Sequence, residues 1–235
     1  MKKLPIKESI EFAAKTMWNN IGTILLGSVS WFIALVLGII SVLFVGGGIV
    51  SGLYYVAFRS MGYSMSLMRI VCGILFPISI ITAVIALLFI VSALYLGFNK
   101  FLLQFDDEHE GSIETIFSCF NSITFRYIIT AILRKILVLI GLILFIIPGI
   151  FFLIRFQFYR LLIIDRNDGI ISSLRNSYRI TRGRTLTLLI VTILITLLHY
   201  ISGIFAILVV PFTLLIQIYL YRFLRAEKEQ TLISK

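Results

Sequence analysis

Arginines inside long apolar stretches are the residues of this sequence most able to do chemistry. Arg155 comes seven residues after Pro148, within an apolar run. At about 1.5 Å per helical residue, it lies roughly 10 Å along the helix from that proline. A guanidinium so placed either binds an anion in a cavity or snorkels and hydrogen-bonds to neighbouring helices. The candidate ligand-binding residues of this group are Arg134, Lys135, Arg155 and Arg160.

A second arginine group lines one face of a predicted helix over 169–182. Its members recur at i, i+4 and i+7: Arg175, Arg179 and Arg182. The apolar arc beside them consists of Ile170, Ile171, Leu174 and Tyr178. Arginines at such an edge reach lipid phosphates while the apolar arc enters the acyl boundary. The group is therefore either a site for an anionic lipid or phosphate-bearing ligand, or an orientation signal with generic headgroup contact.

Other catalytic or metal-binding constellations are not visible in the sequence. His109 and His199 stand alone, without the Ser/His/acid or His/Glu spacing of hydrolases and metal enzymes. The acidic run 106–110 lacks the spacing of an EF-hand, and Cys72 and Cys119 fit small apolar fillers. No carboxylate lies in the interior of an apolar span, which argues against a proton relay and against buried ion pairs there. We therefore predict no enzyme activity, no cofactor and no metal site.

The composition of the chain indicates what kind of helices carry these arginines. The chain has 235 residues, of which 60% are hydrophobic and 14% charged, with a mean hydropathy of +1.06. Soluble domains average about 45–50% apolar and about 25% charged residues, so this composition predicts one all-α membrane domain over 1–235. The formal net charge of +10 comes from cations near the ends of apolar runs. That placement favours contact with anionic headgroups and argues against a nucleic-acid partner.

Six apolar segments are candidate membrane spans, since a crossing takes about 20 residues, although the fourth of them is short. They are 21–45, 70–97, 127–147, 150–165, 184–202 and 204–223. Pro148 and Gly149 predict a tight hairpin turn between the third and the fourth. The three glycines at 46–48 predict the end of the first helix, which leaves 46–69 as either a seventh span or an interfacial elbow.

The distribution of lysine and arginine favours six spans. With six, the basic N-terminus, the 165–184 loop and the C-terminal tail share the cytoplasmic side, and only Arg59 and Arg69 stay outside. A seventh span would move either the N-terminus or the loop outward. The sequence thus predicts a multi-pass protein with both termini in the cytoplasm.

Three amphipathic helices are predicted on the cytoplasmic face, each before a pair of spans, over 6–18, 112–126 and 169–182. Ser112 fits the cap of the second, and Gly183 fits a stop after the third. The first two share the tripeptide Ser-Ile-Glu. This similarity indicates either a unit of interfacial helix plus hairpin used three times, or a coincidence of short sequence.

The longest recognisable pattern begins with the run GLILFIIPGI at 141–150. It continues through Asp165, Gly169, Ile170, Ser173, Leu174, Arg175, Ser177, Arg179, Thr181 and Gly183. The pattern resembles the YciC-like family of uncharacterised bacterial inner-membrane proteins, and the membrane domain fused to some glycerophosphodiester phosphodiesterases. The resemblance implies a six-span protein of the bacterial inner (cytoplasmic) membrane, of unestablished role, and supplies no catalytic residue. Family members usually carry a small residue and a proline where this chain has Tyr159 and Arg160, which puts a shared helix kink in doubt.

Together these features predict a non-enzymatic membrane protein that binds anionic lipid headgroups or membrane protein partners, further copies of itself included. The alternative is a small permease or exporter for an anionic or amphipathic substrate, with Arg155 in its path. A polar cavity lined by Arg155, Gln157 and Gln217 would favour transport, whereas a solid apolar core would favour binding.

Overall fold

The computed structural model describes residues 4–60, 65–105 and 111–233, and within these ranges the chain is helical and contains no strand. The first half consists of α1 (Ile6–Asn19), α2 (Ile21–Ser60), α3 (Met65–Gln104) and the short 3₁₀ helix η1 (Ile113–Phe117). The second half consists of α4 (Ser122–Leu144), α5 (Ile146–Arg155), α6 (Tyr159–Arg166), α7 (Ile170–Ile180), α8 (Thr185–Ser202), η2 (Gly203–Phe205) and α9 (Ala206–Ile233). The predicted all-α class is therefore confirmed.

Six segments of the described chain are long and apolar enough to cross a membrane. They are Ile21–Gly52, Phe76–Gln104, Ser122–Leu144, Ile146–Arg166, Thr185–Ser202 and Ala206–Gln230. Large apolar side chains on these segments face outward, and Ile147 is 81% exposed. Such surface is favourable in hydrocarbon and unfavourable in water. The chain is a multi-pass membrane protein.

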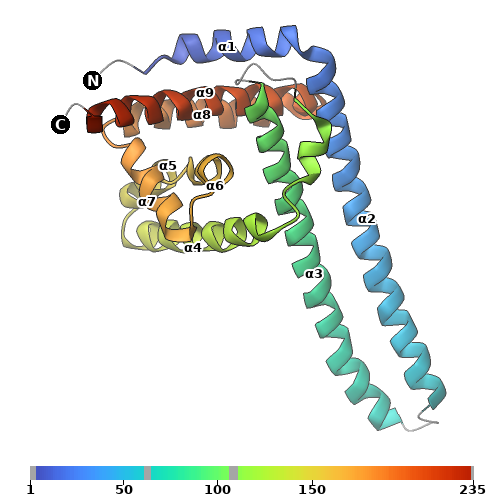
Figure 1. The fold of residues 1–235 in the computed structure, drawn as a ribbon. Helices are drawn as coiled ribbons and strands as arrows, with labels where there is room; N and C mark the ends of the chain where they lie inside the picture. Colours follow the sequence, from blue (N-terminus) through green and yellow to red (C-terminus); the bar gives the residue numbers. More distant parts are fainter. Residues whose placement is uncertain (1–3, 61–64, 106–110, 234–235) are drawn as a thin grey trace.

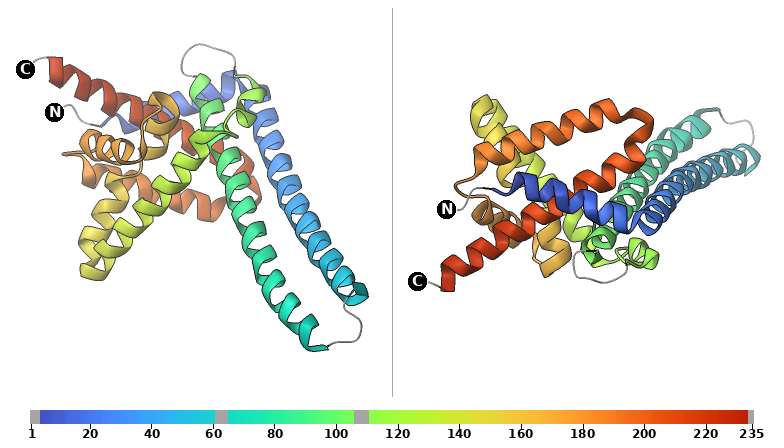
Figure 2. Two further views of the ribbon diagram at one scale, coloured as in Figure 1. Left: turned by 60° about the horizontal axis from the view of Figure 1, so that its bottom comes forward. Right: turned by 90° about the horizontal axis from the view of Figure 1, so that it is seen from above.

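Three helical hairpins diverge from a common centre, as Figure 1 shows. They are α2–α3, α4–α5 and α8–α9. In both views of Figure 2 the turns of the hairpins lie on one side of the molecule, and the start of α1 and the end of α9 lie on the other. This arrangement puts both ends of the described chain on the same side, as an even number of crossings requires.

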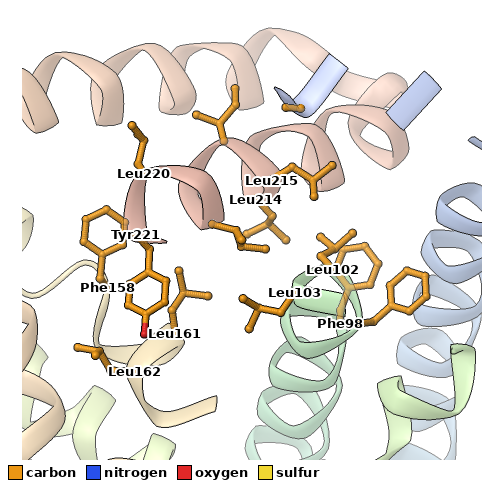
Figure 3. Packing of buried hydrophobic residues seen from close by; sticks show 14 of the residues in the cluster. Phe98, Leu102, Leu103, Phe158, Leu161, Leu162, Leu214, Leu215, Leu220 and Tyr221 are labelled. Carbon is orange, nitrogen blue, oxygen red and sulfur yellow. The ribbon is translucent and has the colours of Figure 1, made fainter. Parts of the chain in front are cut away.

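The buried core lies where α9 packs against α6 and α3 (Figure 3). From α9 it receives Leu214, Leu215, Leu220 and Tyr221. From the other two helices it receives Phe98, Leu102, Leu103, Leu161 and Leu162. Among the six apolar segments, α9 and the α5–α6 segment bury the largest share of their length. These two segments therefore hold the hairpins together.

The first helix does not end at the glycines of 46–48. Instead, α2 continues through them to Ser60, and α3 begins at Met65. Where it is described, the segment 46–69 thus belongs to α2 and α3 and is neither a seventh span nor an elbow. Residues 61–64 lie outside the described residues. A glycine costs a helix only about 1 kcal/mol, whereas breaking backbone hydrogen bonds in hydrocarbon costs several. Continuing the helix is therefore the cheaper outcome.

The hairpin near Pro148 exists, but its turn is three residues earlier than predicted. α4 ends at Leu144 and α5 begins at Ile146, so Phe145 alone makes the turn. Pro148 occupies the first turn of α5, where its missing N–H leaves no hydrogen bond unmade. A Cβ added to Gly149 would lie 2.8 Å from the backbone nitrogen of Leu142, so this glycine is needed for the close approach of α4 and α5.

Two of the three predicted amphipathic helices form, as α1 and α7. The one over 112–126 does not, and only the 3₁₀ helix η1 forms there before α4 begins. The Asn121 side chain accepts a hydrogen bond from the Ile123 N–H (2.9 Å) and starts α4 at Ser122. Ser112 makes no side-chain cap. A short element precedes each hairpin, but the hairpins differ in length.

Candidate anion-binding site

Hydroxyl groups of α7 hold the break between α5 and α6. The Arg155 carbonyl accepts hydrogen bonds from Ser177 Oγ (2.8 Å) and Thr181 Oγ1 (3.3 Å). The Phe158 N–H donates to Ser177 Oγ (3.2 Å). These bonds replace some of the helical backbone hydrogen bonds that are missing at residues 156–158. The apolar segment predicted over 150–165 thus consists of two short helices, α5 and α6. The bend between them has backbone groups that hydrogen-bond to side chains of α7 and of Thr181 just after it.

The face of α7 that meets the protein is polar, which the sequence interpretation missed. Ser173, Ser177 and Thr181 are fully buried, together with Leu174. Leu174 was expected in the lipid-facing arc, but it packs with Tyr159 and Ile163 of α6. The three hydroxyl residues recur every four positions, and this spacing was the available signal for a buried polar face.

Arg155 is 7% exposed and is held without a carboxylate among the described residues. Its Cζ lies 4.6 Å from the ring centroids of both Phe151 and Tyr178. Its Nη1 donates to the Tyr178 carbonyl (3.2 Å), and its Nε has no partner. Cation–π contacts and one carbonyl satisfy only part of a group with five N–H donors. Arg155 therefore keeps capacity for an anion.

A separate arginine cluster lies where α3, α4, α6 and α9 meet. Arg160 donates to Tyr95 Oη (2.5 Å) and to Gln217 Oε1. The Cζ of Arg134 lies 5.7 Å from the ring centroid of Tyr159. The Nε atoms of both arginines are buried without a partner. As for Arg155, every polar partner found here in the described chain is neutral.

The α7 arginines lie at the surface. Arg175, Arg179 and Arg182 are exposed, and none forms an ion pair with a described residue. Arg155 bonds to the Tyr178 carbonyl and its own carbonyl accepts from Thr181, so it lies beside the segment that carries Arg179 and Arg182. Lys135 is exposed on α4. The structure thus divides the predicted residues into an α7–Arg155 group and an Arg134–Arg160 group.

Other arginines pair with carboxylates in an ion-pair layer at the C-terminal ends of α6 and α9 and the N-terminal end of α8. Arg184 Nη2 lies 2.7 Å from both carboxylate oxygens of Glu227. Arg225 contacts Asp165 and Glu229, and Tyr221 Oη donates to Asp165 (2.7 Å). These carboxylates lie at helix ends, as the sequence indicated, and neutralise the cations beside them.

The described residues contain no group of three His, Cys, Asp or Glu side chains that could hold a metal. The acidic run 106–110 lies outside them, so the prediction for that run stays a prediction. Cys119 is buried, and burial raises the pKa of its thiol above the ordinary value, which keeps it protonated. Cys119 therefore fits the predicted apolar filler.

Three cavities along the described helices are apolar. One of about 580 Å³ lies between α2, α3 and α9 and is lined by Trp31, Phe98 and Val210. The other two, of about 360 and 680 Å³, lie between the distal parts of α2 and α3. Arg155, Gln157 and Gln217 line none of the three. Lipid chains fit such grooves better than a polar substrate does.

Comparison with known proteins relates the second half of the chain to an uncharacterised family. Residues 116–231 match a domain of unknown function (DUF7847), and the match covers slightly less than half of the chain. It includes the α5–α6 bend, α7 and the ion-pair layer. No curated protein and no solved structure matches the chain.

Proposed function

We propose that this chain is a non-enzymatic protein of the bacterial cytoplasmic membrane that binds the phosphate groups of anionic lipids. The binding residues are Arg175 and Arg179 on α7, Arg182 in the turn after it, and Arg155. The observation that carries the proposal is the arginine surplus of this region, since none of the four pairs with a described carboxylate. Phosphate oxygens are the natural partners of unpaired guanidinium groups at a membrane surface.

The orientation in the membrane belongs to this proposal. The positive-inside rule puts α7, α1 and the C-terminal end of α9 in the cytoplasm. Reporter fusions after residues 60 and 175 are then expected to report opposite sides of the membrane. A report from the same side would contradict the proposed orientation. The resemblance to YciC-like proteins, which lies inside the matched residues 116–231, supports a bacterial inner membrane.

A lipid-binding measurement tests the proposal directly. In the Arg175→Gln/Arg179→Gln variant, we expect at least threefold less phosphatidylglycerol to remain bound after purification, as measured by native mass spectrometry. The matched control is Lys7→Gln/Lys15→Gln on α1, which removes the same charge from exposed positions. Equal losses in both variants would mean generic charge attraction, and no loss in the α7 variant would contradict the site.

Arg155→Ala separates the buried from the exposed part of the site. If Arg155 binds lipid phosphate, this variant loses bound anionic lipid although the charges of α7 remain. Unchanged lipid binding would confine the site to α7. Uptake of an anionic solute by reconstituted protein would favour the alternative of a permease, which the three apolar cavities do not support.

A further inference from the structure

The turn of the α4–α5 hairpin is wholly apolar and lies exposed on the surface of the protein. Its five exposed residues range from 62% to 81% exposed: Ile143, Leu144, Phe145, Ile146 and Ile147. None of the five is polar, and none is of a type that concentrates at membrane–water interfaces. A turn that reached the far surface of a bilayer would end among headgroups and water, where such residues are disfavoured.

The other two hairpins end differently. At the α8–α9 turn Tyr200 is 88% exposed, and His199 Nε2 lies 3.2 Å from Thr213 Oγ1. Near the end of α2, Arg59 Nη1 donates to Tyr55 Oη (2.9 Å). Aromatic and charged residues of this kind concentrate at membrane–water interfaces. Both hairpins thus carry the ends expected of helices that cross the whole bilayer.

The distance from the turn to the nearest lysine or arginine also distinguishes α4–α5 from α8–α9. In α8–α9, Arg184 and Arg222 each stand 19 positions from Gly203, or about 28 Å of helix, which matches a hydrocarbon core of about 30 Å. In α4–α5, Lys135 and Arg155 each stand ten positions from Phe145, or about 15 Å. The cation-free part of each arm of α4–α5 is therefore long enough for one leaflet only, although α4 and the α5–α6 segment as a whole have the length of a span.

We propose that α4–α5 is a re-entrant hairpin that enters a single leaflet, with its turn among the acyl chains. Arg134, Lys135 and Arg155 then lie at the phosphate level of that same leaflet. If the hairpin crossed completely, exposed Lys135 would face lipid near the bilayer centre, which is unfavourable. The positive-inside count is the same for both arrangements, because a hairpin returns to its starting side.

The backbone of the turn suits an apolar setting. Phe145 is its single non-helical residue, and its N–H donates to the Gly141 carbonyl (3.0 Å). The Gly149 N–H donates to the Phe145 carbonyl (3.4 Å), and Pro148 has no N–H to satisfy. Both backbone groups of Phe145 therefore have partners, as a turn inside hydrocarbon requires of its non-helical residue. This inference does not depend on lipid binding by α7.

Single cysteines at two hairpin turns test the insertion depth. The background carries Cys72→Ser and Cys119→Ala, and the two probes are Ile147→Cys and, as the control, Tyr200→Cys. With a membrane-impermeant maleimide, we expect Tyr200→Cys to react from the side opposite residue 175. Ile147→Cys is expected to react at least tenfold less, from either side of the membrane. Reaction of Ile147→Cys from the same side as Tyr200→Cys would overturn the proposal.

A depth measurement decides the question without relying on low reactivity. A bimane attached to Ile147→Cys in phosphatidylcholine vesicles is expected to be quenched most by lipids with nitroxide groups near the ends of their acyl chains. Strongest quenching by a headgroup nitroxide would overturn the proposal. Ile143→Cys, on α4 and 75% exposed, repeats the measurement if the first variant does not fold.

Discussion

Two groups of buried or half-buried arginines in this protein are held in opposite ways. In the ion-pair layer, Arg184 and Arg225 lie against carboxylates from α6 and α9. In the bundle, Arg155 and Arg160 lie against aromatic rings, a carbonyl, a phenol and an amide. Arg184 and Arg155 are equally buried, at 7% exposed, so burial alone does not determine which partner an arginine has.

The difference follows from where carboxylates can stand. A carboxylate in the apolar part of a bundle is a second ion that must be removed from water, and its attraction to an arginine often fails to offset that cost. Near the ends of α8 and α9 the cost is smaller, and ion pairs form there. The interior arginines therefore keep a net positive charge, which makes them available to an anion.

Removing a carboxylate from the ion-pair layer should have the largest effect. Glu227→Gln leaves Arg184 buried without its bidentate partner, and we expect the free energy of unfolding to fall by about 3 kcal/mol. Chemical unfolding in detergent measures the loss. The control is Glu11→Gln, since Glu11 pairs with Lys7 while both side chains are mostly exposed; a loss below about 1 kcal/mol is expected. Equal losses would remove the distinction between the two pairs.

A medium effect is expected at the α5–α6 bend, where Arg155 has no carboxylate partner among the described residues. Ser177→Ala leaves the Phe158 N–H without its acceptor and removes one donor to the Arg155 carbonyl, at a cost of about 1–3 kcal/mol. Ser172→Ala is the matched control on the exposed face of the same helix and should change stability by less than about 0.5 kcal/mol. If Ser177→Ala proved as mild as its control, α7 would not be holding the α5–α6 bend.

The smallest effect is expected when Arg160 is given a carboxylate partner like those of the ion-pair layer. Gln217→Glu offers Arg160 a carboxylate at the position of the present amide. Attraction and desolvation nearly offset each other, so stability should change by less than about 1 kcal/mol. Gln157→Glu, whose side chain accepts from Thr192 instead, lacks that compensation and should lose more. If Gln217→Glu lost more stability than Gln157→Glu, Arg160 would not be compensating the charge of a carboxylate placed beside it.

Short-range patterns in the sequence predicted what depends on nearby residues. The amphipathic periodicity over 6–18 and 169–182 predicted α1 and α7, because such patterns are set within a few turns. The same approach was wrong at 46–48, where it judged glycine by its helix propensity alone. It also missed the α5–α6 bend, since the bend depends on Ser177, 22 positions from Arg155.

The linear pattern of residues specified the solvent: with 60% hydrophobic residues and six long apolar segments, the chain is suited to fold in hydrocarbon. It also determined which arginines would lie near apolar surface. Which of them meet a carboxylate depends on how the helices pack, because Arg184 and Glu227 are 43 positions apart and come together through the packing of α8 and α9. An ion pair depends on the separation of two side chains in space, and distance along the chain does not specify it.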